Sequence, residues 1–184
     1  MTPLIGLMGA AGAGKDTVGG ILIRAGWQQM AFADPLRDGL AAMLWLPTEC
    51  YVSRKEQPIE WLGGATPRML MQTLGTEWGR NLVCADIWVR IAERRLDAFE
   101  RADTFEPVPI AGVVFTDVRF PDEAAMIRRR GGALWRIERP GVTPVRAHVS
   151  ETAAANVAAD RIVVNDGTLL DLEMRVAALL REAT

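Results

Sequence analysis

Residues 9–17 read Gly9-Ala10-Ala11-Gly12-Ala13-Gly14-Lys15-Asp16-Thr17. Their spacing matches the G-x-x-x-x-G-K core of a phosphate-binding loop. Glycines let the backbone turn tightly and direct successive N–H groups at phosphate oxygens, and a following helix adds the positive end of its dipole. A lysine places a cation beside the terminal phosphates of a nucleotide, where charge shifts during transfer. A plain glycine turn between a strand and a helix is the alternative.

The flanks of the loop favour phosphate binding. Leu4–Met8 is a short apolar run that predicts a buried strand, and Lys15–Arg24 carries an apolar stripe that predicts a helix. We therefore expect the donor phosphates of ATP to contact Gly12, Ala13, Gly14, Lys15, Asp16 and Thr17. The position after the lysine usually carries Ser or Thr as a magnesium ligand. Here it is Asp16, so the magnesium contact is either Asp16, through water, or Thr17.

Strands and helices alternate along the rest of the chain. Further strands are expected at 27–33, 110–116, 133–138 and 161–164, with helices starting near Asp34-Pro35 and Thr66-Pro67 and covering 86–101, 121–130 and 168–182. This alternation predicts a three-layer α/β fold, in which helices flank a parallel sheet of about five strands. We expect one domain over residues 1–184, with a mobile segment at about 47–66.

Composition narrows the class of protein. The net charge of −2 argues against a nucleic-acid polymer as partner, because no global positive field would attract phosphodiester backbone. No stretch of membrane-spanning length lacks charges, and the first residues do not form a signal peptide. Cys50 and Cys84 have neither metal-ligand nor redox spacing. We expect a cytoplasmic protein with reduced cysteines.

The strand expected at 110–116 is followed by Asp117, Arg119 and Glu123. In open α/β sheets, ligands gather at the carboxyl ends of strands. A guanidinium offers a planar fork of donors, so Arg119 is the candidate ligand of an acceptor phosphate. Asp117 would hold the water shell of the metal or orient that arginine. The alternative makes Asp117 a helix-start residue and Arg119 a surface ion-pair partner.

A second candidate segment starts at Arg68. Gly75 lies in the middle of a predicted helix, at a cost of about 1 kcal/mol against alanine, which indicates a close approach. In an α-helix Arg68 lies two turns from Gly75 and Thr76 on one face, so one ligand would reach all three. Close packing of a neighbouring helix on Gly75 is an equal alternative. Trp88 is either a stacking surface for a base or a core residue.

The last candidates lie in the second half of the chain. Arg139 begins a loop that we expect to close over ATP as a lid, at about 139–152. Asn165 and Gly167 follow the last strand and either form the rim around adenine or make an ordinary strand-to-helix turn. His148 is expected to be structural, because an ionised acceptor phosphate needs no base.

These residues together resemble the deoxynucleoside monophosphate kinases of tailed bacteriophages, within the P-loop nucleoside monophosphate kinases. The resemblance runs nearly end to end. It includes Gly14–Thr17, Arg68–Thr76, Asp117–Arg119 with Glu123, Arg139–Gly141, His148–Glu151 and Asn165–Thr168. It implies phosphoryl transfer from ATP with Mg²⁺ to a deoxynucleoside monophosphate, in the cytoplasm of a bacterial host if the gene is phage-borne. It also implies that the acceptor pocket contains Arg68, Gly75, Thr76, Trp88, Asp117, Arg119 and Glu123, with Arg54 and Lys55 as further candidates.

The expected mechanism is in-line transfer by positioning and charge neutralisation, with Lys15, Arg119 and Asp117 as the catalytic group. Two other functions stay open: a dephospho-CoA kinase or another small-metabolite kinase, and a module that binds ATP without transferring phosphate. A homodimer also stays open. The chain is short between Asp34 and Arg68, so the base preference is not fixed by the sequence.

Overall fold

The computed structural model describes residues 2–103, 110–142 and 157–182. Its contacts divide the chain into two compact units, Met1–Ala31 with Leu96–Thr184 (unit 1) and Phe32–Arg95 (unit 2). The single domain over 1–184, the mobile segment at 47–66 and the lid at 139–152 stay predictions. Most of that lid, including His148, lies outside the described residues.

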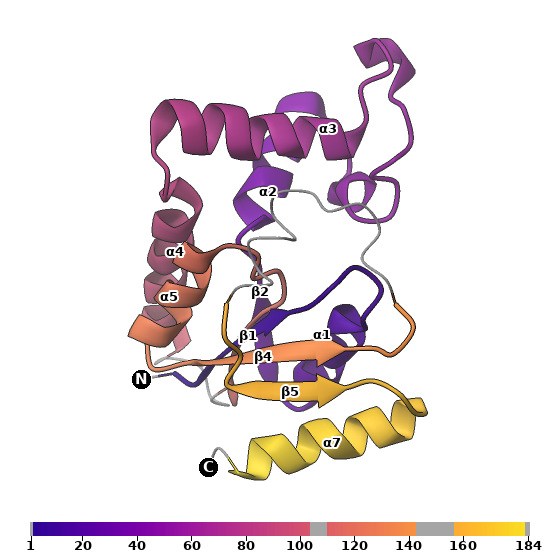
Figure 1. Cartoon of the computed structure of the whole chain (residues 1–184). Coiled ribbons are helices and arrows are strands. Elements are labelled where there is room, and N and C mark those ends of the chain that lie inside the picture. The colour runs from indigo at the N-terminus through magenta and orange to yellow at the C-terminus, as the bar shows by residue number, and fades with distance from the viewer. Residues whose placement is uncertain (1, 104–109, 143–156, 183–184) are drawn as a thin grey trace. The chain divides into compact units, whose positions relative to one another are not determined.

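Unit 1 is built on a parallel sheet of five strands in the order β2-β3-β1-β4-β5 (Figure 1). The strands are β1 (Leu4–Met8), β2 (Trp27–Met30), β3 (Gly112–Phe115), β4 (Ala133–Glu138) and β5 (Arg161–Val164). The central strand β1 pairs with β3 through Ile5 opposite Val114, and with β4 through Leu7 opposite Trp135. Every residue of β1 and β3 is buried, which explains their apolar runs.

Helices cover both faces of this sheet. On one face, α1 (Lys15–Arg24) and α7 (Leu169–Glu182) bury Leu22 and Val176 against Leu7, Trp135 and other core side chains. On the other face, α5 (Pro121–Arg129) packs Ile127 over the small surface of Gly6. The expected three-layer α/β fold with about five parallel strands is confirmed.

Because all strands are parallel, their carboxyl ends meet at one edge of the sheet. The glycine loop follows β1, and the Asp117–Arg119 turn follows β3, the strand next to it. Val118 N–H donates to Leu7 O at 3.2 Å, which ties that turn to β1. Arg139 follows β4 and Asn165 follows β5. The topology therefore brings four of the predicted segments to the same edge.

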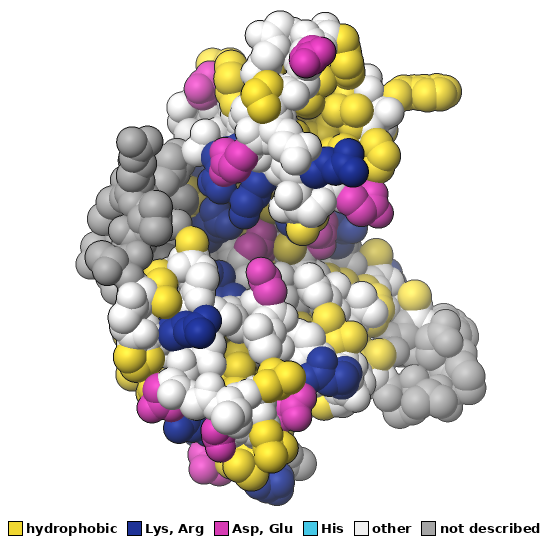
Figure 2. Space-filling view, turned by 90° about the vertical axis from the view of Figure 1, so that its right-hand side faces the viewer, with side chains coloured by type: hydrophobic (Ala, Val, Ile, Leu, Met, Phe, Trp, Pro, Cys, Tyr) yellow, Lys and Arg dark blue, Asp and Glu magenta, His cyan; other side chains and the backbone are white. Residues whose placement is uncertain are grey.

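Unit 2 is helical. It contains α2 (Asp34–Leu44), two short 3₁₀ turns, η1 (Thr48–Tyr51) and η2 (Glu60–Leu62), α3 (Pro67–Gln72), the π-helix η3 (Thr73–Val83), and the first half of α4 (Ile87–Asp103). Thr66 caps α3, because its side chain accepts a bond from Met69 N at 3.2 Å. Figure 2 shows hydrophobic side chains on the surface of this unit, at the top of the view.

Three sequence predictions differ from the structure. The strand expected at 27–33 ends at Met30, because β3, its partner, is itself only four residues long. Ala33 occupies the N-cap position of α2 without a side-chain capping bond, so Asp34 lies in the first turn, where it pairs with Arg37 at 2.5 Å. The helix after Thr66 changes from α to π at Thr73.

Gly79 in η3 leaves no space for a side chain. A Cβ there would lie 2.5 Å from an atom of the Trp88 ring, whereas one at Gly39 in α2 would meet nothing within 4 Å. We expect Gly79→Ala to destabilise the protein by about 1–3 kcal/mol, because the added methyl group would overpack against the rigid Trp88 ring. Gly39→Ala, the matched control, is expected to stabilise by about 0.5–1 kcal/mol. Urea unfolding of both variants measures this; equal effects would contradict it.

Candidate active site

The glycine loop between β1 and α1 has the backbone of a phosphate-binding loop. Gly9, Gly12 and Gly14 all have positive φ, at 146°, 79° and 104°. A side chain at Gly9 would overlap Ile137 O, so only glycine fits there. Within the part of the chain that the structure describes, the N–H groups of Gly12 and Gly14 donate to no acceptor. The loop thus presents free backbone donors at the start of a helix, where its dipole favours an anion.

Lys15 spans the loop. Its Nζ donates to Gly9 O at 2.7 Å and to Ala10 O at 2.8 Å, and its side chain is partly buried. The ammonium is therefore held inside the curve of the loop. Asp16 and Thr17 are exposed in the first turn of α1. Neither geometry nor burial separates these two as the magnesium contact, so both stay candidates.

Glu123 holds the turn that carries Arg119. Its carboxylate is only 4% exposed and accepts bonds from Arg119 N at 2.7 Å and Phe120 N at 3.1 Å. The carboxylate thereby satisfies N–H groups at the start of α5, as the acidic member of a capping box does. Arg119 itself is exposed, and no described residue bonds its guanidinium. Asp117 is half-buried and engaged with other groups. Direct contact of Glu123 with a substrate stays a prediction.

We expect Glu123→Gln to reduce the free energy of unfolding by about 1.5–3 kcal/mol, the usual contribution of hydrogen bonds to a charged group. Glutamine keeps the shape but loses the negative charge that two N–H groups share. Glu173→Gln is the control, because the Glu173 side chain forms an exposed pair with Arg24, worth about 0–1 kcal/mol, and bonds no other group in the described part of the chain. Urea unfolding compares them. Equal small losses would show that the two N–H bonds contribute little.

Asn165 contacts the glycine loop directly. Its Nδ2 donates to Ala13 O at 3.0 Å, and its backbone N–H donates to Glu138 O at 2.7 Å.

Gly167 lies against Asp171, whose carboxylate accepts bonds from Thr168 N at 2.8 Å and Thr168 Oγ1 at 2.7 Å. These bonds from Thr168 lower the pKa of Asp171. Arg139 is exposed in the turn after β4. Contact of Asn165, Gly167 or Arg139 with ATP stays a prediction.

In unit 2, Gly75 and Trp88 come together. Trp88 is 6% exposed, and its indole N–H donates to Gly75 O at 2.7 Å. A Cβ at Gly75 would lie 3.2 Å from Leu36, so close packing accounts for this glycine. Both residues therefore have core roles, and their contact with an acceptor stays a prediction.

Asp86, at the start of α4, accepts hydrogen bonds from the side chains of Arg90 and Cys84. The bond from Arg90 has the larger effect and that from Cys84 the smaller, and together they lower the pKa of Asp86 to about 2.

Arg68 and Thr76 are both exposed, whereas Gly75 is buried. Thr73–Val83 is a π-helix, which closes its bonds over five residues and turns less per residue than an α-helix, so the α-helical spacing behind the expected common face does not hold there. Contact of one ligand with all three residues stays a prediction. Arg68 forms an ion pair with Glu56, a residue that the sequence analysis missed. A partner twelve residues away in a loop follows no spacing rule. Arg54 and Lys55 are exposed beside it.

The matches to known proteins decide the family. The family model for deoxynucleotide monophosphate kinase matches residues 64–176, more than half of the chain. The chain belongs to the deoxynucleotide monophosphate kinase family. The match includes the predicted acceptor segments from Arg68 to Glu123, and Arg139 and Asn165 beyond them.

Relatives in this family come from viruses and phages. A protein of Acanthamoeba polyphaga mimivirus, named as a candidate deoxynucleotide monophosphate kinase, is 32% identical over 189 residues, covering 98% of this chain and 97% of the relative. The deoxynucleotide monophosphate kinase of Escherichia phage RB69 is 27% identical, over 62% of this chain and 44% of its own. The deoxynucleoside-5'-monophosphate kinase of Escherichia phage T5 is 40% identical over 34% of this chain and 22% of its own.

Two solved structures have a fold similar to that of this chain. The structure of TT1252 from Thermus thermophilus matches with a TM-score of 0.53 at 21% identity, covering 100% of this chain and 98% of that one. The dephospho-CoA kinase of Campylobacter jejuni matches with a TM-score of 0.54 at 14% identity, over the same shares. At these identities the likeness extends to the P-loop kinase fold and no further.

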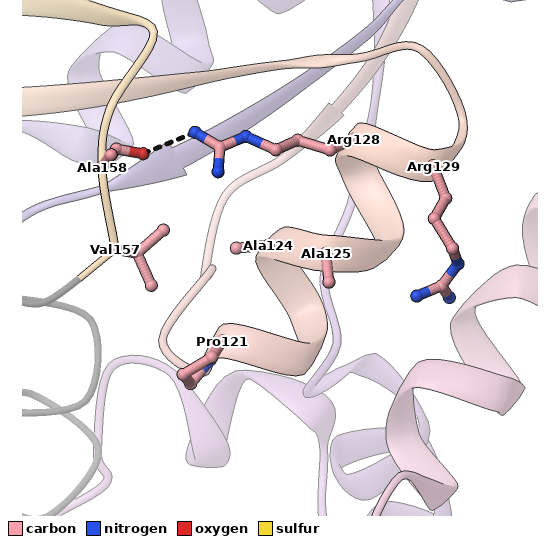
Figure 3. Close-up of a pocket in the computed structure, with 7 residues that line it drawn as sticks. All are labelled: Pro121, Ala124, Ala125, Arg128, Arg129, Val157 and Ala158. Atoms are coloured by element: carbon pink, nitrogen blue, oxygen red, sulfur yellow. Dashed lines mark hydrogen bonds between the residues drawn. The ribbon is translucent and has the colours of Figure 1, made fainter.

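A groove of about 610 Å³ lies on α5 of this kinase-family chain, away from the glycine loop in sequence. Its walls are Pro121, Ala124, Ala125, Arg128, Arg129, Val157 and Ala158. Figure 3 shows Arg128 directed at Ala158, whose carbonyl it binds at 2.8 Å, whereas Arg129 extends away from that segment. Arg128 also pairs with Asp160 at 3.1 Å. The groove contains none of the predicted site residues. Its Arg128 is engaged by Ala158 and Asp160.

Proposed function

We propose that the chain transfers the γ-phosphate of ATP to a deoxynucleoside monophosphate, producing ADP and the diphosphate. The observation that carries this is the glycine loop with free N–H groups and Lys15, at the same sheet edge as Arg119. The family match supports the acceptor class. A chain that only binds ATP would have no use for an exposed arginine on the neighbouring strand end, whose guanidinium no described residue bonds.

The loop fits a nucleoside triphosphate. Phosphate oxygens need N–H donors and a cation, and the loop offers the Gly12 and Gly14 N–H groups and the Lys15 ammonium. Lys15 would exchange its carbonyl partners for phosphate oxygens and neutralise charge on the transferred group. Gly14 N–H would hold the same phosphate chain from the backbone. Arg119 would bind the acceptor phosphate with its planar fork, and Arg68 is a second candidate for that phosphate.

Magnesium fits this loop without a dedicated cage. Among the described residues, no three His, Cys, Asp or Glu side chains cluster as a metal site. Mg²⁺ in phosphoryl transfer usually takes one or two protein ligands, with phosphate oxygens and water as the others. Thr17 or Asp16 would hold it, and when bound it would neutralise charge on the phosphates. Asp117 would contact its water shell.

The setting of the reaction completes the proposal. No helix in residues 2–103, 110–142 and 157–182 combines the length and apolar character needed to cross a bilayer. We place the enzyme in the cytoplasm, of a bacterial host if the gene is phage-borne, with small nucleotides as partners rather than a nucleic-acid polymer. The exposed apolar side chains of unit 2 leave a homodimer open.

An acceptor panel tests this function. ADP release is measured with each of the four common deoxynucleoside monophosphates, the ribonucleoside monophosphates, dephospho-CoA and no acceptor. We expect release to depend on at least one deoxynucleoside monophosphate. Release with dephospho-CoA alone would establish the other kinase, which only the fold likeness favours. ATP binding without acceptor-dependent release would establish a binding module.

A further inference from the structure

Asn165 links two loops that are far apart in the sequence. It is the first residue after β5, and its half-buried side chain reaches Ala13 in the glycine loop. Gly14, the residue that starts α1 with φ at 104°, packs so closely on Asn165 that a Cβ would overlap Asn165 Nδ2. The amide is therefore in contact with both residues of the peptide between Ala13 and Gly14.

This contact fixes the direction of one N–H group. In a planar trans peptide the carbonyl and the following N–H point in opposite directions. Because Ala13 O accepts the bond from Asn165, Gly14 N–H points away from Asn165, and no described residue accepts from it. Ala13 N–H is fixed separately by a 3.2 Å bond to Ala10 O. Glycines on either side would otherwise let this peptide rotate easily.

Asn165 is itself held firmly. Its N–H bonds Glu138 O at the end of β4. Arg175 in α7 donates to Val164 O, just before Asn165, and to Asp166 Oδ1 at 2.6 Å, just after it. Thr168 and Asp171 cap the same helix. Helix α7 thus supports the Asn165 side chain, which contacts the glycine loop.

We infer that Asn165 is a positioning residue, whose amide orients the Ala13–Gly14 peptide so that Gly14 N–H donates to the donor phosphates. This inference rests on the proposed function. It assigns Asn165 to the phosphate end of the donor rather than to the rim around adenine. Preorganised donors lower the barrier because they need no reorientation during transfer. The side chain acts through the loop and need not touch ATP.

The test compares ATP with a ligand that has no base. Calorimetry with Mg²⁺ present measures the binding of ATP and of inorganic tripolyphosphate to wild type, Asn165→Asp and Asn165→Leu. Aspartate has the same shape but cannot donate to Ala13 O, and leucine removes the polar atoms. We expect both variants to bind both ligands at least about tenfold more weakly, because the hydrogen bond from Gly14 N–H to a charged phosphate oxygen is lost. Gln28→Glu and Gln28→Leu, at exposed Gln28 on the opposite edge strand, should bind like wild type.

Each outcome decides the matter. Equal binding of tripolyphosphate by wild type and the Asn165 variants overturns the inference, and a loss confined to ATP assigns Asn165 to adenine. If wild type binds neither ligand, the proposed function fails and the inference fails with it. Should the variants not fold, the Gly14 amide resonance of the wild type decides. We expect tripolyphosphate to shift it downfield, and an unchanged resonance overturns the inference.

Discussion

Lys15→Ala is expected to reduce kcat by about a thousandfold, the upper range for loss of one electrostatic donor to a transition state. The physical reason is that the ammonium neutralises charge on the phosphoryl group while it moves between two oxygens. The lysine lies at the loop and donates to the backbone carbonyls of Gly9 and Ala10, so the fold should survive. Steady-state kinetics with ATP and a deoxynucleoside monophosphate measures the effect.

Two further measurements make the Lys15 result interpretable. Lys15→Met keeps roughly the length of the side chain but removes its charge. It should lose as much activity as Lys15→Ala, because the charge and not the packing of the lysine matters. Thermal unfolding must show that both variants remain folded. A folded Lys15→Ala variant with about a tenth of the wild-type kcat would contradict the assigned role, because electrostatic donors contribute far more than that.

Arg119→Met is expected to reduce kcat/KM for the deoxynucleoside monophosphate by about a hundredfold, because a charged partner is lost from the acceptor phosphate. The KM for ATP should change little, since the glycine loop is intact. Arg119→Lys should recover only part of the loss, because an ammonium cannot make the bidentate contact of a guanidinium. Kinetics at varied acceptor and saturating ATP separates the two substrates.

Arg161→Met is the matched control for Arg119. Arg161 is an exposed arginine of the same unit, on the edge strand β5, and among the described residues its guanidinium binds only Asp160 O, at 2.9 Å. This variant should keep the wild-type kcat/KM. Arg119 would lose its proposed role if its methionine variant behaved like that of Arg161, or if the KM for ATP rose as much as that for the acceptor.

The strands with clear apolar boundaries were predictable from sequence. The bounds of β1, α1, β4 and β5 agree with those expected, because glycines or charged residues delimit each of these segments. The end of β2 was not predictable in the same way. Ala31 and Phe32 are buried and apolar, so their composition continues the strand, but pairing with β3 stops at Met30.

The π-helix was the largest error of local structure. The sequence from Thr66 to Val83 predicts an α-helix by its cap and its apolar residues, and these do not distinguish i→i+4 from i→i+5 bonding. The change appears only in the packing, where Gly79 meets the Trp88 ring and Gly75 O accepts its N–H. As a result, the α-helical spacing from which a common face of Arg68, Gly75 and Thr76 was predicted does not hold beyond Thr73.

The candidate site was predictable where a motif fixes the backbone. The glycine spacing of 9–14 predicted a tightly turned backbone before Lys15, and Gly9, Gly12 and Gly14 have positive φ there. Contacts across the fold were not available from spacing, because they depend on strand order: Asn165 reaches Ala13, and Glu56 reaches Arg68. Glu123 was correctly expected near Arg119, but its bonds to the backbone appear only in the structure.

Phosphate held by residues 9–17 is expected to pass to an acceptor nucleotide. A single-turnover experiment with ATP labelled in the γ-phosphate and one deoxynucleoside monophosphate in excess tests it most directly. We predict that the label is recovered in the β-phosphate of the deoxynucleoside diphosphate. Label that stays in ATP, or appears as inorganic phosphate regardless of the acceptor, would contradict the account.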